Sequence, residues 1–127
     1  MEETQGFIAR GGPVGSLSDP GKVLVSKTVP PGSYMISFTG DLFNADGDNQ
    51  ETTCTLSTGD SASVRIAPLG TASAESLTLQ DCATFNSPTT ISVTCVGFKA
   101  AVNHRSVLTA IEVTSIQGAA GIPCDTC

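Results

Sequence analysis

GSYMISFTGDLF, residues 32–43, alternates apolar side chains with small polar ones, and this alternation decides the fold. In an extended chain, one face of the segment carries Tyr34, Ile36, Phe38 and Leu42. The opposite face carries Met35, Ser37, Thr39 and Asp41. A period of two indicates a β-strand with one face buried and the other in water. The segment therefore predicts a long strand packed on a hydrophobic core.

The same alternation recurs along most of the chain. It is found in GKVLVSKTV (21–29), ETTCTLS (51–57), SASVRIA (61–67), ESLTLQ (75–80) and TTISVTCVGF (89–98). The segment SVLTAIEVTSIQ (106–117) is apolar on both faces, as a central strand would be, and GFIAR (6–10) reads as a short first strand. Turn-forming residues separate these segments, and no segment has a helical period. The pattern predicts an all-β fold, an antiparallel two-sheet jelly-roll sandwich of about eight strands.

Within these strands the alternation also assigns inward faces. In the segment 21–29 it places Val23, Val25 and Val29 on one face together with Lys27. We divide the chain into an N-terminal arm with a short strand (1–17), the jelly-roll sandwich (18–117) and a cysteine-containing tail (118–127).

Composition limits the classes of partner. The 127 residues suffice for one domain that buries roughly two-thirds of its unfolded surface. Twelve acidic side chains against six Lys and Arg give a net charge of −6, and no basic patch is present, so we expect no nucleic-acid binding. No run of apolar residues is long enough for a membrane helix, so we expect no membrane insertion. The first seventeen residues lack the apolar core of a signal peptide, which indicates either a removed signal or synthesis in the cytosol.

Two of the five cysteines fall on predicted inward faces, Cys54 in TTCTLS and Cys95 in SVTCVG. Facing strands of a sandwich would bring them within bridging distance, so we predict a structural disulfide. The loop-entropy model gives its stabilisation as about 4 kcal/mol. The alternative is a pair of buried free thiols that pack as small hydrophobic groups.

The other three cysteines are harder to assign. Cys124 and Cys127 form a C-x-x-C sequence in a Gly/Ala tail, away from the strand-to-helix setting of redox proteins. No second pair has the spacing of a zinc site, so we expect no metal there and a local or interchain disulfide instead. Because five is odd, at least one thiol should be free or paired between chains, and Cys82 is the candidate.

The acidic segment DLFNADGDNQE, residues 41–51, raises the question of calcium. The EF-hand pattern fails here, because taking Gly47 as its sixth position makes Leu42 the first ligand. An oxygen cage built from Asp46, Asp48 and Glu51 stays open as an alternative. Asn, Asp and Gly favour turns, so we interpret the segment as a solvated hairpin tip.

We identify no set of catalytic residues in the sequence. His104 is the only histidine and lies in VNHRS (102–106), which we expect to be a loop. Asp41 or Asp81 would have to orient it, but no G-x-S-x-G elbow supplies a nucleophile. The chain also lacks a phosphate-binding loop and has no Trp and one Tyr to line a sugar cleft. We expect no catalytic residue, no cofactor and no enzyme activity.

Several short motifs resemble a family of bacterial and phage jelly-roll domains related to the C1q and tumour-necrosis-factor-like domains. They are VPPGSYMIS (29–37), CTL (54–56), ISVTC (91–95) and LTAIEV (108–113), which together extend over most of the sandwich. The resemblance implies a homotrimer around a threefold axis, with one sheet of each subunit facing inward. It implies no catalytic residues.

These observations favour a non-enzymatic protein of a phage virion surface. A trimeric capsid decoration protein that binds the major capsid protein or other virion subunits is the first hypothesis, and a tail or fibre tip is the second. The alternative is the trimeric head of a secreted collagen-like adhesin, whose segments 44–50, 67–75 and 102–106 would bind a cell-surface glycan or receptor. A small calcium-dependent lectin-like domain ranks third.

Overall fold

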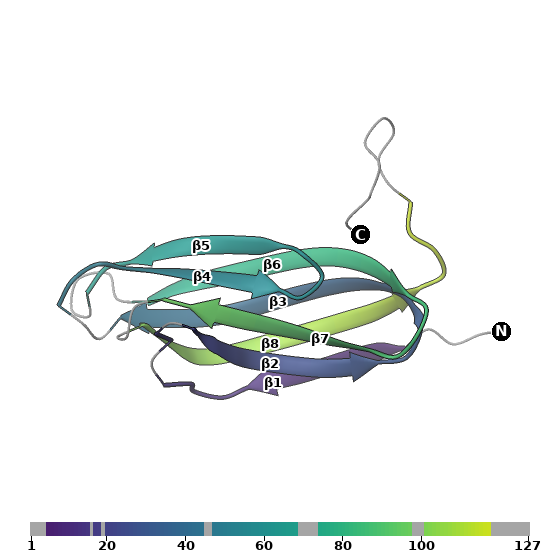
Figure 1. The fold of residues 1–127 in the computed structure, drawn as a ribbon, viewed down its shortest axis with the longest axis horizontal. Helices are drawn as coiled ribbons and strands as arrows, with labels where there is room; N and C mark the ends of the chain where they lie inside the picture. Colours follow the sequence, from purple (N-terminus) through teal and green to yellow (C-terminus); the bar gives the residue numbers. More distant parts are fainter. Residues whose placement is uncertain are drawn as a thin grey trace.

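The computed structural model describes residues 5–15, 17–18, 20–44, 47–68, 74–97 and 101–117. This part of the chain is all-β, as the alternation predicted, and Figure 1 shows the strands running along the long axis of the molecule. The strands are β1 (Gly6–Gly11), β2 (Lys22–Val29), β3 (Gly32–Asn44), β4 (Gln50–Leu56), β5 (Ser61–Ile66), β6 (Ala74–Phe85), β7 (Thr89–Val96) and β8 (Ala101–Val113).

The first four strands pair with the last four in nested, antiparallel order. β1 pairs with β8, β2 with β7, β3 with β6, and β4 with β5. Two further pairings, β3 with β8 and β4 with β7, join these ribbons into sheets of order β1-β8-β3-β6 and β2-β7-β4-β5. A long hairpin rolled up in this way is a jelly roll. The predicted fold class is confirmed, and so is the central position of the strand that contains residues 106–113.

The core lies between the two sheets and is built from the inward half of each alternation. β3 contributes Tyr34, Ile36, Phe38 and Leu42, all of which are buried. The facing sheet contributes Val29, Cys54, Leu56, Ile66, Ile91, Val93 and Cys95. Leu17, in the segment that precedes β2, is fully buried in the same core. Burial of apolar surface on this scale is the main force that holds the two sheets together.

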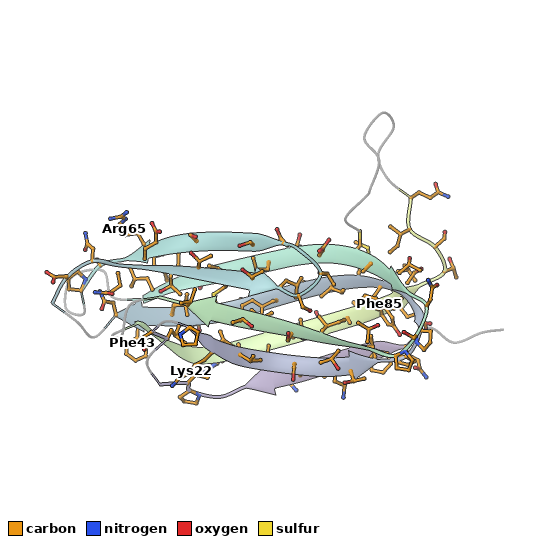
Figure 2. The ribbon with its side chains drawn as sticks, viewed as in Figure 1. Lys22, Phe43, Arg65 and Phe85 are labelled. Carbon is orange, nitrogen blue, oxygen red and sulfur yellow. A yellow bond between two sulfur atoms is a disulfide. The ribbon has the colours of Figure 1, made fainter. Side chains whose placement is uncertain are left out.

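Tyr34 anchors one end of the sandwich. Its hydroxyl donates a hydrogen bond of 2.7 Å to the carbonyl of Pro30, and its ring lies 6.0 Å from Phe7 and 5.9 Å from Phe85. Burial raises the pKa of the Tyr34 hydroxyl above its usual 10.0, and the negative charge of Glu112 raises this pKa further. The neutral phenol is thus the form that the fold stabilises. Figure 2 shows Phe85 at one end of the molecule and Phe43 and Arg65 toward the other.

The N-terminal segment belongs to the sandwich. Residues 6–11 form β1 at the edge of one sheet, and Leu17 is buried. We expected residues 1–17 to be an arm with a short strand, but this segment adds an edge strand and a core residue to the fold.

One inward face differs from prediction. In β2 the pairing with β7 shifts between Val23 and Val25, which marks a β-bulge. A bulge inserts one extra residue and changes which side chains face inward. Leu24 and Val25 are both buried as a result, whereas Val23 is 56% exposed. Placing Val23 on the buried face was therefore wrong.

Candidate functional site: the outer faces of the two sheets

Cys54 and Cys95 form a disulfide within one sheet. They lie directly opposite each other on the neighbouring strands β4 and β7, with their Cα atoms 4.0 Å apart. Such a short separation matches the closely spaced positions of an antiparallel pair. Both cysteines are completely buried. The bond therefore crosses between adjacent strands of one sheet, and not between facing sheets as we had argued.

Cys82 is not a free thiol. It takes part in a disulfide, and none of the cysteines in the described ranges is free. Interpreting Cys82 as the odd thiol was therefore wrong. The predicted tail disulfide between Cys124 and Cys127 lies outside the described residues.

The acidic segment is not a hairpin tip. β3 and β4, which flank it, belong to different sheets, so the chain crosses from one layer to the other here. The buried side chain of Asn44 donates hydrogen bonds from Nδ2 to the carbonyls of Asp48 (2.6 Å) and Ile66 (3.2 Å). These bonds fix the two ends of the crossing. They also satisfy an amide that would otherwise be costly to bury.

Calcium ligation by this segment gains no geometric support. Asp46 lies outside the described residues, and Asp48 is exposed. Glu51 forms an exposed ion pair with Arg65 at 3.4 Å. Within the described ranges, no three His, Cys, Asp or Glu side chains gather as a metal site would require.

The residues considered for catalysis are also placed. The sequence VNHRS lies within β8, so the expected loop around His104 is a strand. Asp41 lies on β3 in register with Arg105, and its carboxylate accepts a hydrogen bond from the Ser76 hydroxyl. Asp81 accepts hydrogen bonds from the Thr58 hydroxyl and from the backbone N–H of Cys82. Each of the two carboxylates has structural partners.

The outer face of the β2-β7-β4-β5 sheet is a surface of hydroxyl groups. Serine and threonine side chains on neighbouring strands hydrogen-bond to each other in three pairs, Thr28–Thr90 (2.7 Å), Thr53–Ser63 (2.6 Å) and Thr55–Ser61 (3.2 Å). Such cross-strand pairs stabilise a sheet by roughly 0.2–1 kcal/mol each. They also engage hydroxyls that a ligand would otherwise use.

The outer face of the other sheet carries an apolar patch, which we define as Ile8 on β1, Met35 on β3 and Ile111 on β8. These side chains are 44%, 51% and 56% exposed, and Val23 is the only other large apolar side chain so exposed in the described ranges. Met35 lies directly opposite Ile111, and Ile8 lies opposite Thr109, next to Ile111 along β8. The three side chains therefore form one surface.

A shallow hollow accompanies the apolar patch. Its volume is about 170 Å³, and its walls include Met35 and Ile111 on the apolar side. The remainder is lined by Ile36, Ser37, Gln80, Asp81 and Thr109. A second hollow of about 270 Å³ lies beside it and is polar, lined by Gly59, Asp60, Gln80 and Asp81. The largest exposed apolar patch on a small protein is often functional, so the outer face of β1-β8-β3-β6 is the candidate interaction surface.

Sequence reasoning found part of this surface. The alternation in 32–43 placed Met35 on the outward face, and Ile111 was assigned to a strand that is apolar on both sides. What joins them is the β3–β8 register, because it sets the two side chains opposite each other. No local sequence signal contains that register.

The fold and its surfaces define an eight-stranded jelly-roll domain. No protein-family model matches the chain, and no curated protein is similar to it in sequence. Among solved structures, it is similar to the CBM35 module of Cellvibrio japonicus Abf62, with 8% identity and a TM-score of 0.44 over 87% of this chain and 99% of that one. The described residues include no helix able to span a membrane.

Two viral structures are also similar. One is the virus-like particle of the extra small virus of the prawn Macrobrachium rosenbergii, with 13% identity and a TM-score of 0.39 over 89% of this chain and 80% of that one. The other is infectious bursal disease virus, Gx strain, with 14% identity and a TM-score of 0.46 over 90% of this chain and 37% of that one. At such values, function has to be argued from the residues of this chain.

Proposed function

We propose that the chain is a non-enzymatic structural protein of a phage virion surface, a trimeric capsid decoration protein. The observation that carries the proposal is the filled interior. The inward faces of both sheets consist of packed hydrocarbon side chains and the buried Cys54–Cys95 bond, and the two hollows described above are shallow and lie outside the core. This interior supports a function that the surfaces perform by contact with other molecules.

Among the uses of a jelly roll, this interior favours the mechanical ones. The fold occurs in viral capsid proteins, lectins and cupins. A metal-dependent cupin needs clustered ligands inside the barrel, and the described interior offers none. A lectin usually stacks a sugar ring on an aromatic side chain. Here Tyr34 is buried, and the sequence has no tryptophan. A structural subunit needs only a stable body and a contact surface.

The cross-linked, hydroxyl-covered sheet suits such a role. Charged residues make up only 14% of the sequence, and Ser and Thr side chains on β2-β7-β4-β5 bond to one another. In this proposal, subunits associate as trimers, and the residues before Gly6 attach each trimer to the shell. Because only the assembled lattice presents the site, binding stabilises the assembled state by mass action.

Two measurements on the full-length protein test the proposal. Light scattering in solution should give three times the mass of the chain. Sedimentation with shells built from the major capsid protein of the same phage should carry the full-length chain into the pellet. A version starting at Gly6 keeps β1 and should stay trimeric while losing shell binding.

The opposite results are equally clear. A monomer in solution would overturn the trimer. A trimer that ignores the shells would overturn the decoration role, and binding of that trimer to a cell-surface glycan would establish the adhesin head in its place.

A further inference from the structure

The two long sides of the sandwich carry opposite charges. β1 and β2 are edge strands of the two sheets and lie together along one side, whereas β5 and β6 lie together along the other (Figure 1). Arg10 on β1 and Lys22 and Lys27 on β2 are exposed, and neither strand contains an Asp or Glu. We call these three residues the basic side, which holds half of the six Lys and Arg residues of the chain.

The opposite side is acidic. Glu75 and Asp81 lie on β6, which contains no Lys or Arg, and Asp60 directly precedes β5. The cation of β5, Arg65, is already paired with Glu51. Within the described ranges, the carboxylates of Asp60, Glu75 and Asp81 form no ion pair, so their charges are open to a cation from another molecule. We call these three residues the acidic side.

The acidic side is hollowed. The polar hollow of about 270 Å³ is lined by Gly59, Asp60, Gln80 and Asp81. It shares Gln80 and Asp81 with the hollow of about 170 Å³ whose apolar wall is formed by Met35 and Ile111. A carboxylate-lined hollow and an apolar one therefore meet at β6.

The basic side presents the complementary groups. Ile8 is exposed and lies two residues from Arg10, so both side chains project to the same face of β1. An apolar group and a cation thus lie next to each other on this edge. The charges also extend over similar lengths, about 17 Å along β2 and about 20 Å along β6 at about 3.3 Å per residue.

This charge pattern favours a second copy of the chain in one orientation. Copies with a net charge of −6 repel each other unless opposite charges meet locally. A twofold contact would set the basic side against itself, and like charges opposed across an interface weaken binding. A head-to-tail contact sets the basic side of one copy against the acidic side of the next. Such contacts close into a ring when the rotation between neighbours permits it.

We propose that the basic side of one copy packs against the acidic side of the next, with Arg10 at the polar hollow and Ile8 at the apolar one, and that three such contacts close a trimer. β1 and β6 are the two edges of the sheet that carries the apolar patch, so the contact also covers part of that patch. The inference rests on the proposed trimer and adds which surfaces form it, but it does not depend on the virion role.

Charge changes on each side test the contact in the full-length protein. The basic-side variant carries Lys22→Glu and Lys27→Glu, and the acidic-side variant carries Asp60→Asn and Glu75→Lys. Asp60→Asn keeps the side-chain oxygen that accepts a hydrogen bond from the backbone N–H of Gln80. We expect each variant to raise the dissociation constant of the trimer by about tenfold or more in analytical ultracentrifugation. The variant that combines all four substitutions again opposes unlike charges, so it should recover most of the lost affinity.

The two variants separate this contact from the effect of net charge. The basic-side variant makes the chain more negative and the acidic-side variant makes it less negative, so general repulsion between copies predicts opposite effects. Raising the ionic strength from about 0.1 M to about 1 M shortens the Debye length from about 10 Å to about 3 Å and should weaken the wild-type trimer. Damage to the fold by either pair of substitutions would not be repaired in the combined variant.

Each outcome decides between the contact and the function proposed above. A wild-type trimer that both variants leave unchanged would overturn this contact and keep the trimer. Dissociation without recovery in the combined variant would also overturn the contact. A monomeric wild type would overturn the contact and the trimer together. Recovery as expected, without sedimentation of the wild-type trimer with shells, would support the contact and overturn only the decoration role.

Discussion

Removing the Cys54–Cys95 bond should destabilise the fold mainly because it increases the conformational entropy of the unfolded chain. The two cysteines are 41 positions apart in the sequence, yet they lie on adjacent strands that are already paired. The bond therefore adds few contacts to the folded state. It restricts the unfolded chain, and the loop-entropy relation for a loop of this length gives about 4 kcal/mol. For a domain of this size, that loss corresponds to a fall in Tm of roughly 15 °C.

The experiment uses a Cys82→Ser background, so that Cys54–Cys95 is the only disulfide among the described residues. Into it we introduce Cys54→Ala and Cys95→Ala together. Urea unfolding is followed by the fluorescence of Tyr34, since the chain has one Tyr and no Trp. The free energy of unfolding should fall by about 4 kcal/mol relative to the background.

Reduction provides the control for lost packing. Strong reductant should destabilise the background protein by a similar amount and leave the double alanine variant unchanged. A loss below about 1 kcal/mol on reduction would refute the unfolded-state explanation. It would mean that the reduced chain keeps β4 and β7 together even when unfolded.

Three further predictions concern single positions. Because the pKa of Tyr34 is raised in the folded state, Tyr34 stabilises the fold fully below pH 10, and this stabilisation is lost as the pH rises through the folded pKa. In that alkaline range the urea midpoint should fall more steeply with pH for wild type than for Tyr34→Phe. Thr52 Oγ1 is buried without a hydrogen-bond partner in the described part of the chain, so Thr52→Val should raise the free energy of unfolding by about 1 kcal/mol in urea titrations, and a decrease would contradict this. Gly21 has φ +95°, and a Cβ at this position would lie 2.7 Å from the carbonyl oxygen of Cys95. Gly21→Ala should therefore lower Tm and reduce the free energy of unfolding by roughly 1–3 kcal/mol. An unchanged Tm would disprove the strain.

The strands were predictable because alternation is a local property. Tyr34, Ile36 and Phe38 fall on the buried face that the sequence assigned to them. An isolated strand pattern indicates its own two faces, because neighbouring side chains point to opposite sides. Val23 escaped this rule because a bulge changes the count by one, and the bulge depends on the partner strand β7.

The connections were less predictable because sheet membership depends on distant pairing. The turn-rich segment after Asn44 has the composition of a hairpin, yet it joins strands of different sheets. The same uncertainty explains Cys54 and Cys95, whose inward positions were correct while their placement on facing strands was wrong. Both outcomes follow from which strands are neighbours: the β4–β7 pairing, which joins two of the nested ribbons into one sheet, places Cys54 beside Cys95.

The candidate site, like the sheet connections, depends on the pairing register of strands that are distant in the sequence. Met35 and Ile111 are 76 positions apart in the sequence, and each alone is an ordinary exposed side chain. Only the β3–β8 register makes them neighbours.

Cross-strand hydroxyl pairs occur on both outer faces, as with Ser33 and Thr84 on β3 and β6, and the faces differ in their clustered apolar area. On β2-β7-β4-β5, hydroxyls such as Thr28 and Thr53 already bond across the strands, so a partner would have to break or share those bonds. On β1-β8-β3-β6, the exposed area of Met35 and Ile111 gains free energy from any apolar cover. Contacts of this domain with another subunit should therefore concentrate on the second face. Substitutions at Ile111 should change them more than equally exposed substitutions at Val23.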